Sequence, residues 1–332
     1  MDARALVWHG NQDFELVRVP VPELGPDELI VEMSAASICG SDRHTVSGSR
    51  SAPRPSILGH EGVGTVIESR RDGFEPGQRV VFSVAAVCGR CDNCQRGLSA
   101  KCRSVAKAGH ERFDGPWPLS GTFATHMHVV KGQKVSVVPD TVSDAVAATA
   151  GCAVATVMAV MEAAGPVAGR TVLVNGVGML GLVAVAEARR QGAAEVIGCD
   201  PGEVSRKIAT GVADRLAPTA VGLHADVVLE LSGVRRGVID ALGTLNVGGT
   251  AVLAGSVIPT AEVPLDPEWI VRGWRTVTGV HNYEPHHLDQ AVEFLAEVDL
   301  PWDDILASPI ILEELPAAFM RNDDHLRVVV KL

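Results

Sequence analysis

Residues 171–181 read Thr-Val-Leu-Val-Asn-Gly-Val-Gly-Met-Leu-Gly, a short apolar run that leads into a glycine-rich turn. The apolar run predicts a buried strand over Thr171–Asn175, and the residues after the turn predict a helix over Met179–Gln191. A G-x-G-x-x-G turn between a strand and a helix is typical of dinucleotide binding, because the free N–H groups at the helix start face a pyrophosphate. The expected cofactor-binding residues are Gly176, Val177, Gly178, Met179, Leu180 and Gly181.

The next predicted strand, Glu195–Cys199, ends in Asp200. A carboxylate at that position accepts hydrogen bonds from the adenosine ribose hydroxyls, whereas a 2′-phosphate there would be repelled. The sequence therefore favours NAD(H) over NADP(H), although Arg206 and Lys207 lie close enough in sequence to soften that preference.

Strands and helices continue to alternate beyond this turn, which is typical of a parallel sheet covered on both faces. Further strands are expected at Asp226–Glu230, Thr250–Ala254 and Arg327–Lys331, with helices near Glu203–Thr210, Arg235–Leu245 and His287–Val298. Upstream, valine-rich runs broken by Gly and Pro predict an irregular β domain; they cover Glu28–Ala35, Gly62–Glu68, Gln78–Val84 and His126–Val130. We therefore expect an α/β chain with a β-rich domain over 1–148, a dinucleotide-binding domain over 149–285 and a C-terminal segment over 286–332.

Composition excludes several classes of function. The net charge of −11 argues against a nucleic-acid partner. The long alanine-rich stretch Val142–Ala164 carries Ser143, Asp144 and Thr156, which indicates a buried helix and not a membrane span. No secretory signal precedes the seven cysteines, so a reducing compartment, the cytoplasm, is expected.

Four cysteines lie within a short segment in the spacing C-x2-C-x2-C-x7-C: Cys88, Cys91, Cys94 and Cys102. This spacing brings four thiolates within reach of one tetrahedral metal ion, and zinc suits that geometry best. Two disulfides are the alternative, and a reducing compartment disfavours them.

Three further residues can bind metal but have ordinary explanations when taken singly. Cys39 and Cys152 can be buried small apolar side chains, and His60 can be a core histidine with a satisfied hydrogen bond. His126 and His128 form an H-x-H pair, but alternation along a strand predicts that they face solvent together.

Together, the cysteine quartet, the pair His60-Glu61 and the glycine-rich turn resemble the zinc-dependent medium-chain alcohol dehydrogenase family, over essentially the whole chain. The resemblance implies a GroES-like catalytic domain and a Rossmann domain, two zinc ions per chain and NAD(H). It implies that Cys39, His60 and Cys152 hold a catalytic zinc, that Glu61 lies beside it, and that the quartet holds a structural zinc. It also implies a homodimer or homotetramer.

The same resemblance assigns a proton relay and a phosphate contact. Ser41 stands where the family has a hydroxyl that touches the substrate oxygen, and His44 where it has the outer base. Arg327 matches a pyrophosphate contact, although a surface arginine at a strand edge is an equal alternative. Many family members carry Arg after the first zinc cysteine, whereas this chain has Gly40. The chain also lacks the Glu-Pro pair of many polyol dehydrogenases.

A small alcohol or aldehyde is the implied substrate, interconverted by hydride transfer. The segment Gly279–Leu288, with three histidines, resembles a branch associated with phosphonate metabolism, which implies an anionic substituent. Its contact is expected among Arg43, Arg50 and Arg112, since an arginine fork suits such an oxyanion. Alternatives are a polyol or amino-alcohol dehydrogenase, a zinc-free quinone or enoyl reductase, and an inert protein that senses NAD(H).

Overall fold

The computed structural model describes residues 1–321 and 324–332. The chain forms two compact units. Unit 1 comprises residues 1–155, 284–297 and 306–332, and unit 2 comprises residues 156–283 and 298–305. The chain thus leaves unit 1 after the β-rich region and returns to it near its C-terminal end.

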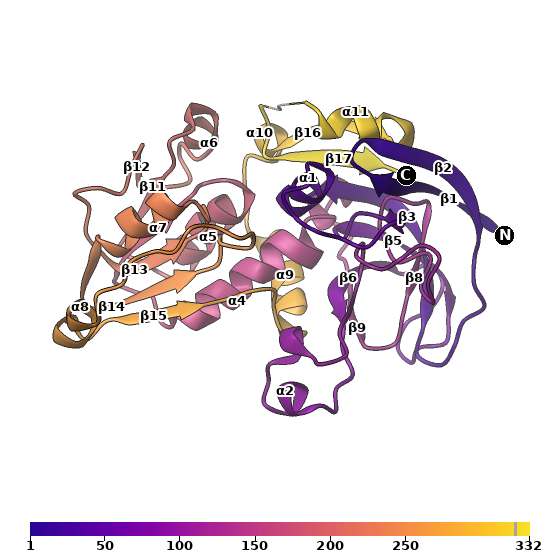
Figure 1. The fold of residues 1–332 in the computed structure, drawn as a ribbon, viewed down its shortest axis with the longest axis horizontal. Helices are drawn as coiled ribbons and strands as arrows, with labels where there is room; N and C mark the ends of the chain where they lie inside the picture. Colours follow the sequence, from indigo (N-terminus) through magenta and orange to yellow (C-terminus); the bar gives the residue numbers. More distant parts are fainter. Residues whose placement is uncertain (322–323) are drawn as a thin grey trace. The chain divides into compact units, whose positions relative to one another are not determined.

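Unit 2 is built on a six-stranded sheet with the order β12-β11-β10-β13-β14-β15, in which all neighbours are parallel (Figure 1). Numbered along the chain, this is the order 3-2-1-4-5-6 of a doubly wound dinucleotide-binding fold. The strands are β10 (Thr171–Asn175), β11 (Glu195–Cys199), β12 (Arg215–Ala217), β13 (Ala225–Glu230), β14 (Leu245–Leu253) and β15 (Thr276–Gly279). The helices that follow them are α5 (Met179–Arg190), α6 (Glu203–Ile208), α7 (Arg235–Leu242) and α8 (Pro267–Gly273).

Parallel strands covered on both faces bury nearly all their side chains, and this explains the continuous apolar runs in the sequence. Leu173, Ile197 and Val228 belong to one buried cluster of this unit. The strands predicted at 171–175 and 195–199 are confirmed residue for residue. The prediction of helix up to Leu245 is wrong, because α7 ends at Leu242 and Leu245 already begins β14.

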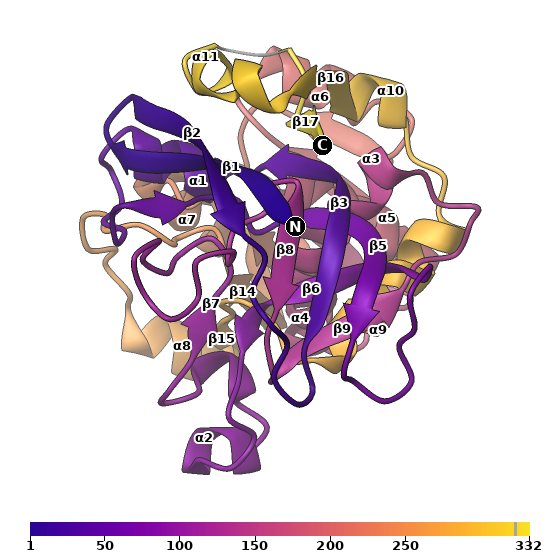
Figure 2. The same ribbon diagram turned by 90° about the vertical axis from the view of Figure 1, so that its right-hand side faces the viewer.

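Unit 1 contains two sheets. The smaller has the order β2-β1-β4, from β1 (Asp2–Gly10), β2 (Asp13–Pro20) and β4 (Ser56–Ile57). The larger is mostly antiparallel and has the path β16-β17-β3-β5-β6-β7, with β8 added to β3 and β9 to β6; β3 and β5 run side by side in Figure 2. Its strands are β3 (Leu29–Ile38), β5 (Gly62–Ser69), β6 (Arg79–Ala86), β7 (Ala106–Lys107), β8 (His126–Val129), β9 (Gln133–Val137), β16 (Leu306–Ile311) and β17 (Arg327–Lys331).

Unit 1 also contains helices and 3₁₀ turns between these strands. They are α1 (Gly40–Val46), α2 (Asp92–Gln95), the 3₁₀ turn η1 (Ser99–Lys101), α3 (Asp144–Ala147), α9 (His286–Glu297), the 3₁₀ turn η3 (Leu312–Glu314) and α11 (Leu315–Phe319). The short α10 (Trp302–Ile305) ends the part of unit 2 that follows α9. The predicted fold class, a GroES-like β-rich domain with a Rossmann domain, is confirmed by this architecture.

One helical stretch, Asp144–Ala164, is long and apolar enough to span a membrane by length and composition. It consists of α3, a π-helical turn η2 (Ala150–Val154) and α4 (Ala155–Ala164). Its most apolar window is 78% buried inside the protein, which agrees with the predicted core helix.

The prediction that His126 and His128 face solvent is wrong. All four residues of β8 are buried, so both faces of this strand are covered and alternation no longer separates inside from outside. His128 Nε2 lies 2.9 Å from a carboxylate oxygen of Glu28, and His126 Nδ1 lies 3.0 Å from Oγ1 of Thr125.

Candidate active site

The four clustered cysteines converge in a lobe that projects from β6 and β7 and carries α2 (Figure 1). Their Sγ atoms all lie within 4.8 Å of one another, and none is in a disulfide. Backbone hydrogen bonds involving Arg90 and Cys91 lower the pKa of Cys88 to about 6, which favours the thiolate that binds metal. Four convergent sulfurs fit one zinc ion with a closed coordination shell.

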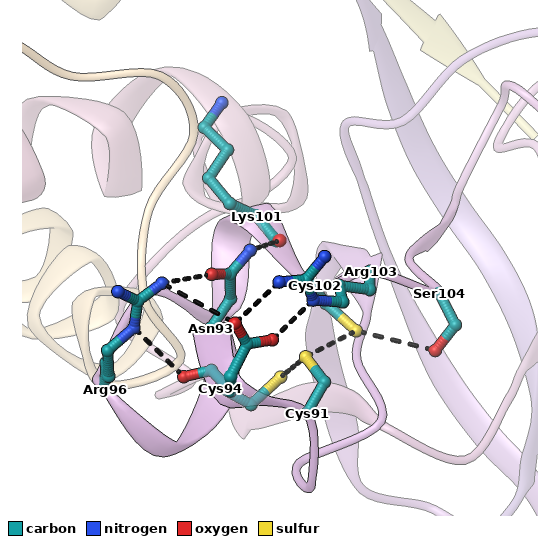
Figure 3. Close-up of polar contacts among 9 residues, drawn as sticks. Cys91, Asn93, Cys94, Arg96, Lys101, Cys102, Arg103 and Ser104 are labelled. Carbon is teal, nitrogen blue, oxygen red and sulfur yellow. Dashed lines mark hydrogen bonds and ion pairs between the residues drawn. The ribbon is translucent and has the colours of Figure 1, made fainter.

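Polar contacts hold the lobe around these sulfurs (Figure 3). Arg103 forms two hydrogen bonds to the Asp92 carboxylate, at 2.5 and 2.7 Å. Asn93 Nδ2 donates to the Lys101 carbonyl at 2.7 Å, and its side-chain oxygen accepts from Arg96 at 2.7 Å. These contacts connect the segments that carry the four sulfurs.

The three scattered residues also come together, at the junction of several elements of unit 1. Cys39 lies between β3 and α1, His60 lies just before β5, and Cys152 lies in the π-helical turn. One donor atom from each residue lies within 4.8 Å of the other two. A hydrogen bond between the two sulfurs lowers the pKa of Cys39 and raises that of Cys152. Two sulfurs and one imidazole fit a three-ligand zinc site that leaves one position open.

Asp42 orients two of these groups. One carboxylate oxygen accepts a hydrogen bond from the Cys39 backbone N–H at 2.9 Å. The other lies 3.3 Å from Nδ1 of His60, at ion-pair distance but without the alignment of a full hydrogen bond. Although burial acts in the opposite direction, Asp42 raises the pKa of His60. With Nδ1 directed to Asp42, Nε2 is the nitrogen left for a metal.

Behind the triad, Glu61 and Arg327 form a buried pair. Arg327 Nε lies 3.3 Å from Oε2 of Glu61, and its Nη2 lies 3.8 Å from Sγ of Cys39. Glu61 also accepts a hydrogen bond from the Ser37 hydroxyl. Burial raises the pKa of Glu61 to about 7, while Arg327 acts to lower it. Arg327 is therefore not a surface arginine at a strand edge.

Ser41 and His44 occupy successive turns of α1, three residues apart, so they share one face of the helix. Ser41 Oγ lies 3.3 Å from Nε2 of His60, next to the nitrogen available for a metal. This arrangement brings the predicted hydroxyl to one candidate metal-binding atom and leaves His44 further along the same helix.

In unit 2 the glycine-rich turn has the predicted local geometry. Gly176 adopts φ = +93°, and Gly178 is the N-cap residue immediately before α5. A Cβ at Gly181 would lie 1.9 Å from the Gly176 carbonyl oxygen, so only glycine permits this helix–strand contact. Asp200 receives hydrogen bonds from the backbone N–H groups of Val177 at 3.0 Å and Gly202 at 2.7 Å.

His110 was not predicted from the sequence as a site residue. Its ring lies beside that of His60, with 5.4 Å between centroids and 55° between planes. Burial lowers the pKa of His110 to about 4, and the charges of His60 and Arg50 act in the same direction. A single histidine downstream of the cysteine lobe carries no spacing signal, so no pattern in the sequence indicated it.

The three candidate arginines differ in their surroundings. Arg112 forms two hydrogen bonds with Asp114, at 2.6 and 2.7 Å. Nη1 of Arg43 lies 3.2 Å from each of three main-chain carbonyl oxygens, those of Ala318, Phe319 and Arg321. Arg50 lies close enough to Lys107 for its charge to act on that residue: burial lowers the pKa of Lys107, and the charges of Lys101 and Arg50 act in the same direction.

The sequence matches known protein families and relatives over nearly its whole length. Residues 25–140 match the alcohol dehydrogenase GroES-like domain, and residues 147–332 match the glucose dehydrogenase C-terminus. L-threonine 3-dehydrogenase of Streptomyces avermitilis is 31% identical over 325 residues, with 92% of this chain and 91% of that protein covered. The chain belongs to the zinc-type alcohol dehydrogenase family.

Solved structures of family members agree with this assignment. An alcohol dehydrogenase of Thermotoga maritima superposes with a TM-score of 0.92 at 25% identity, covering 100% of this chain and 99% of its own. A protein of Sinorhizobium meliloti described as a zinc-binding dehydrogenase, solved with NADP bound, gives a TM-score of 0.90 at 27% identity, with both chains covered completely.

Proposed function

We propose that this alcohol dehydrogenase uses zinc and NAD(H) to interconvert a small primary or secondary alcohol and its aldehyde or ketone. The observation that carries the proposal is the convergence of Cys39, His60 and Cys152, with Ser41 Oγ beside Nε2 of His60. We assign the catalytic zinc to these three residues and the structural zinc to Cys88, Cys91, Cys94 and Cys102.

When bound, zinc supplies a Lewis acid for the substrate oxygen and the nicotinamide supplies the hydride acceptor or donor. The protein's own residues hold and orient. Asp42 fixes the His60 ring and the Cys39 backbone, and so presets the positions of two donor atoms. Glu61 is buried against Arg327, whose guanidinium also reaches the Cys39 sulfur.

We assign the transfer of the substrate proton to two residues of α1, Ser41 and His44. Ser41 Oγ accepts the hydroxyl proton of an alcohol bound next to His60 and releases its own hydroxyl proton, which reaches solvent by way of His44. Histidine suits exchange with water, because its ordinary pKa lies near neutral pH. We assign Ser41 and His44 to this relay, and Glu61 to the catalytic site as the close neighbour of the proposed zinc.

NAD(H) is the proposed cofactor form. The Gly176–Gly181 turn and the start of α5 provide backbone N–H groups for a pyrophosphate. We assign to Asp200, which follows β11, the role of accepting hydrogen bonds from ribose hydroxyls and of repelling a 2′-phosphate. Arg327 belongs to unit 1, and we keep it as a proposed pyrophosphate contact in addition to its pairing with Glu61.

Two substrate classes follow from specific observations. The similarity to an L-threonine 3-dehydrogenase supports an amino alcohol or a related polar alcohol. A phosphonate-bearing alcohol would need a cation, and Arg50 is the strongest of the three candidates. Its charge acts on His110 beside the candidate metal site, and within residues 1–321 and 324–332 no carboxylate pairs with it.

The test is a purified preparation assayed for metal and for turnover. We expect about two zinc ions per chain and zinc-dependent NADH formation from an alcohol panel that includes L-threonine and 2-hydroxyethylphosphonate. Equal or faster turnover of neutral alcohols rules out the phosphonate class. A preparation that is folded, free of zinc and active on quinones or enoyl substrates would favour the zinc-free reductase. Light scattering on the same sample tests the proposed dimer or tetramer.

A further inference from the structure

His110 lies beside the candidate active site, yet the proposed mechanism gives it no role. Its ring contacts that of His60, with 5.4 Å between centroids. It belongs to the segment that follows the cysteine lobe and β7, far in sequence from the three candidate ligands. A histidine in contact with a metal-binding histidine is close enough to meet a small substrate.

The backbone holds His110 firmly in this position. Gly109 adopts φ = +70°, and a Cβ there would lie 2.3 Å from the carbonyl oxygen of Gly59, the residue before His60. The segment is also tied by N–H bonds from Ala108 to the Val84 carbonyl and from Gly109 to the Ser120 carbonyl, both 2.8 Å. Only a glycine at 109 lets the two loops approach so closely. The His110 ring is therefore set against His60 by main-chain packing.

Hydrogen bonding fixes the tautomer of the His110 ring. Nδ1 lies 2.7 Å from the Ala108 carbonyl oxygen, and a carbonyl oxygen can only accept, so Nδ1 carries the hydrogen. In a neutral ring Nε2 then has a lone pair that accepts a hydrogen bond. Among residues 1–321 and 324–332, no donor forms a hydrogen bond to that nitrogen.

We propose that His110 is a specificity residue whose Nε2 accepts a hydrogen bond from a hydroxyl or ammonium group on the carbon next to the reacting carbon. This inference rests on the proposed function and narrows its substrate class to vicinal diols and amino alcohols. We place this contact at the adjacent carbon because the His110 ring lies against the ring of His60. His60 is a proposed ligand of the zinc that would bind the reacting oxygen. A substrate with two neighbouring polar groups can reach both.

The test compares paired substrates that differ only in this second group. The zinc-loaded enzyme is assayed with NAD⁺ on two pairs of alcohols. One pair is butane-2,3-diol and butan-2-ol, and the other is 1-aminopropan-2-ol and propan-2-ol. We expect kcat/KM to favour the diol or the amino alcohol by about tenfold or more, since a site built to bond a polar group rejects analogues that lack it. In His110→Phe, which keeps an aromatic ring, that preference should fall to near unity.

Two further variants separate contact from packing. His110→Leu should lose the preference as His110→Phe does, whereas His110→Gln, with a carbonyl acceptor, should recover part of it, mainly through KM. His9→Phe, an exposed histidine paired with Glu15, is the control and should keep the wild-type ratio. Zinc content and thermal unfolding are measured for each variant, and the ratio is taken from those that retain both.

The outcomes distinguish this inference from the function on which it rests. If the wild-type enzyme turns over mono-alcohols as well as their polar partners, or if His110→Phe or His110→Leu retains the wild-type preference, His110 is not the specificity residue, and the dehydrogenase function stands. If no alcohol in any pair is oxidised by the zinc-loaded enzyme, the proposed function itself fails and this inference fails with it.

Discussion

Arg327 and Glu61 form an ion pair behind Cys39, with side chains 8% and 0% exposed and 3.3 Å between Nε and Oε2. The pair joins β17, near the end of the chain, to the residue after His60. Burial opposes its charge, yet Glu61, Cys39 and Cys152 together hold the pKa of Arg327 above its ordinary value. A cation is thus fixed beside two sulfurs that a metal site needs as thiolates.

Removing that cation should be costly. Arg327→Met leaves Glu61 buried without its partner, and breaking a buried pair in this way costs about 3–5 kcal/mol. The free energy of unfolding, measured by urea titration at neutral pH, should fall by that order. Arg327→Lys keeps the charge but loses the guanidinium group that reaches both Glu61 and Cys39. Its free energy of unfolding should therefore lie between those of the wild type and Arg327→Met. A Met variant as stable as the wild type would contradict the pairing.

Cysteine substitutions should separate the two metal sites. Cys39→Ala removes one ligand of the open site and leaves the four-cysteine lobe complete, so we expect about one zinc per chain and loss of turnover without unfolding. Cys199→Ala is the matched control, because Cys199 is buried in unit 2 and belongs to neither cluster. Elemental analysis beside an NADH assay gives both readouts. Full activity of Cys39→Ala would refute the assignment.

The sequence was sufficient for elements that follow a local rule. A buried parallel strand is an apolar run and a nucleotide turn needs its glycines, so β10, β11 and the start of α5 were predicted within a residue. The convergence of the four cysteines could also be predicted, because they lie close together in the sequence and their sulfurs come within 4.8 Å of one another. These features depend on neighbours in the chain.

Features that depend on distant packing were not predicted. The burial of His126 and His128 follows from the covering of both faces of β8, which no alternation pattern contains. His110 contacts His60 only because Gly109, which has no Cβ, lets its loop pack against the backbone of Gly59. Arg327 was ambiguous in the sequence, since a strand-edge arginine and a buried partner of Glu61 have the same local context.

Asp200 should set the choice between the two nicotinamide cofactors. Asp200→Ser removes the carboxylate that repels a 2′-phosphate, while Arg206 and Lys207 remain near its position. The ratio of kcat/KM for NAD⁺ over NADP⁺ should drop by about tenfold or more, equivalent to at least about 1.4 kcal/mol. Glu203→Gln, which removes an exposed carboxylate of α6, should leave the ratio almost unchanged. An unaltered ratio in Asp200→Ser would exclude Asp200 from cofactor selection.

The free energy of unfolding should depend on pH in part because of Glu230. Burial raises the pKa of this carboxyl, although N–H groups of Ser232 and Gly233 bond to it. A raised pKa means that the folded state holds a proton longer than the unfolded state. Its contribution is therefore complete below the ordinary pKa of about 4.3 and is lost as pH rises through the folded value.

Glu230→Gln cannot titrate, so the stability difference between wild type and variant should shift against the wild type as pH rises from 4 toward neutral. Urea titrations at matched pH values measure it. Glu268→Gln, an exposed residue of α8, serves as the control. A difference that does not change with pH would show that Glu230 ionises normally in the folded protein.

The cysteine lobe should depend on a carboxylate far away in the sequence. Both oxygens of Glu284 accept backbone hydrogen bonds from the start of η1, from Ser99 N–H at 2.9 Å and from Ala100 N–H at 3.0 Å. Glu284→Gln replaces one acceptor by an NH₂ group that faces an N–H donor, which leaves a donor unsatisfied at a cost of about 1–3 kcal/mol. Hydrogen exchange at the amides of residues 99 and 100 should accelerate, and a chelator should remove one zinc faster. Glu293→Gln, exposed on α9, should change neither rate, and equal rates in Glu284→Gln would show that the lobe holds its shape without this contact.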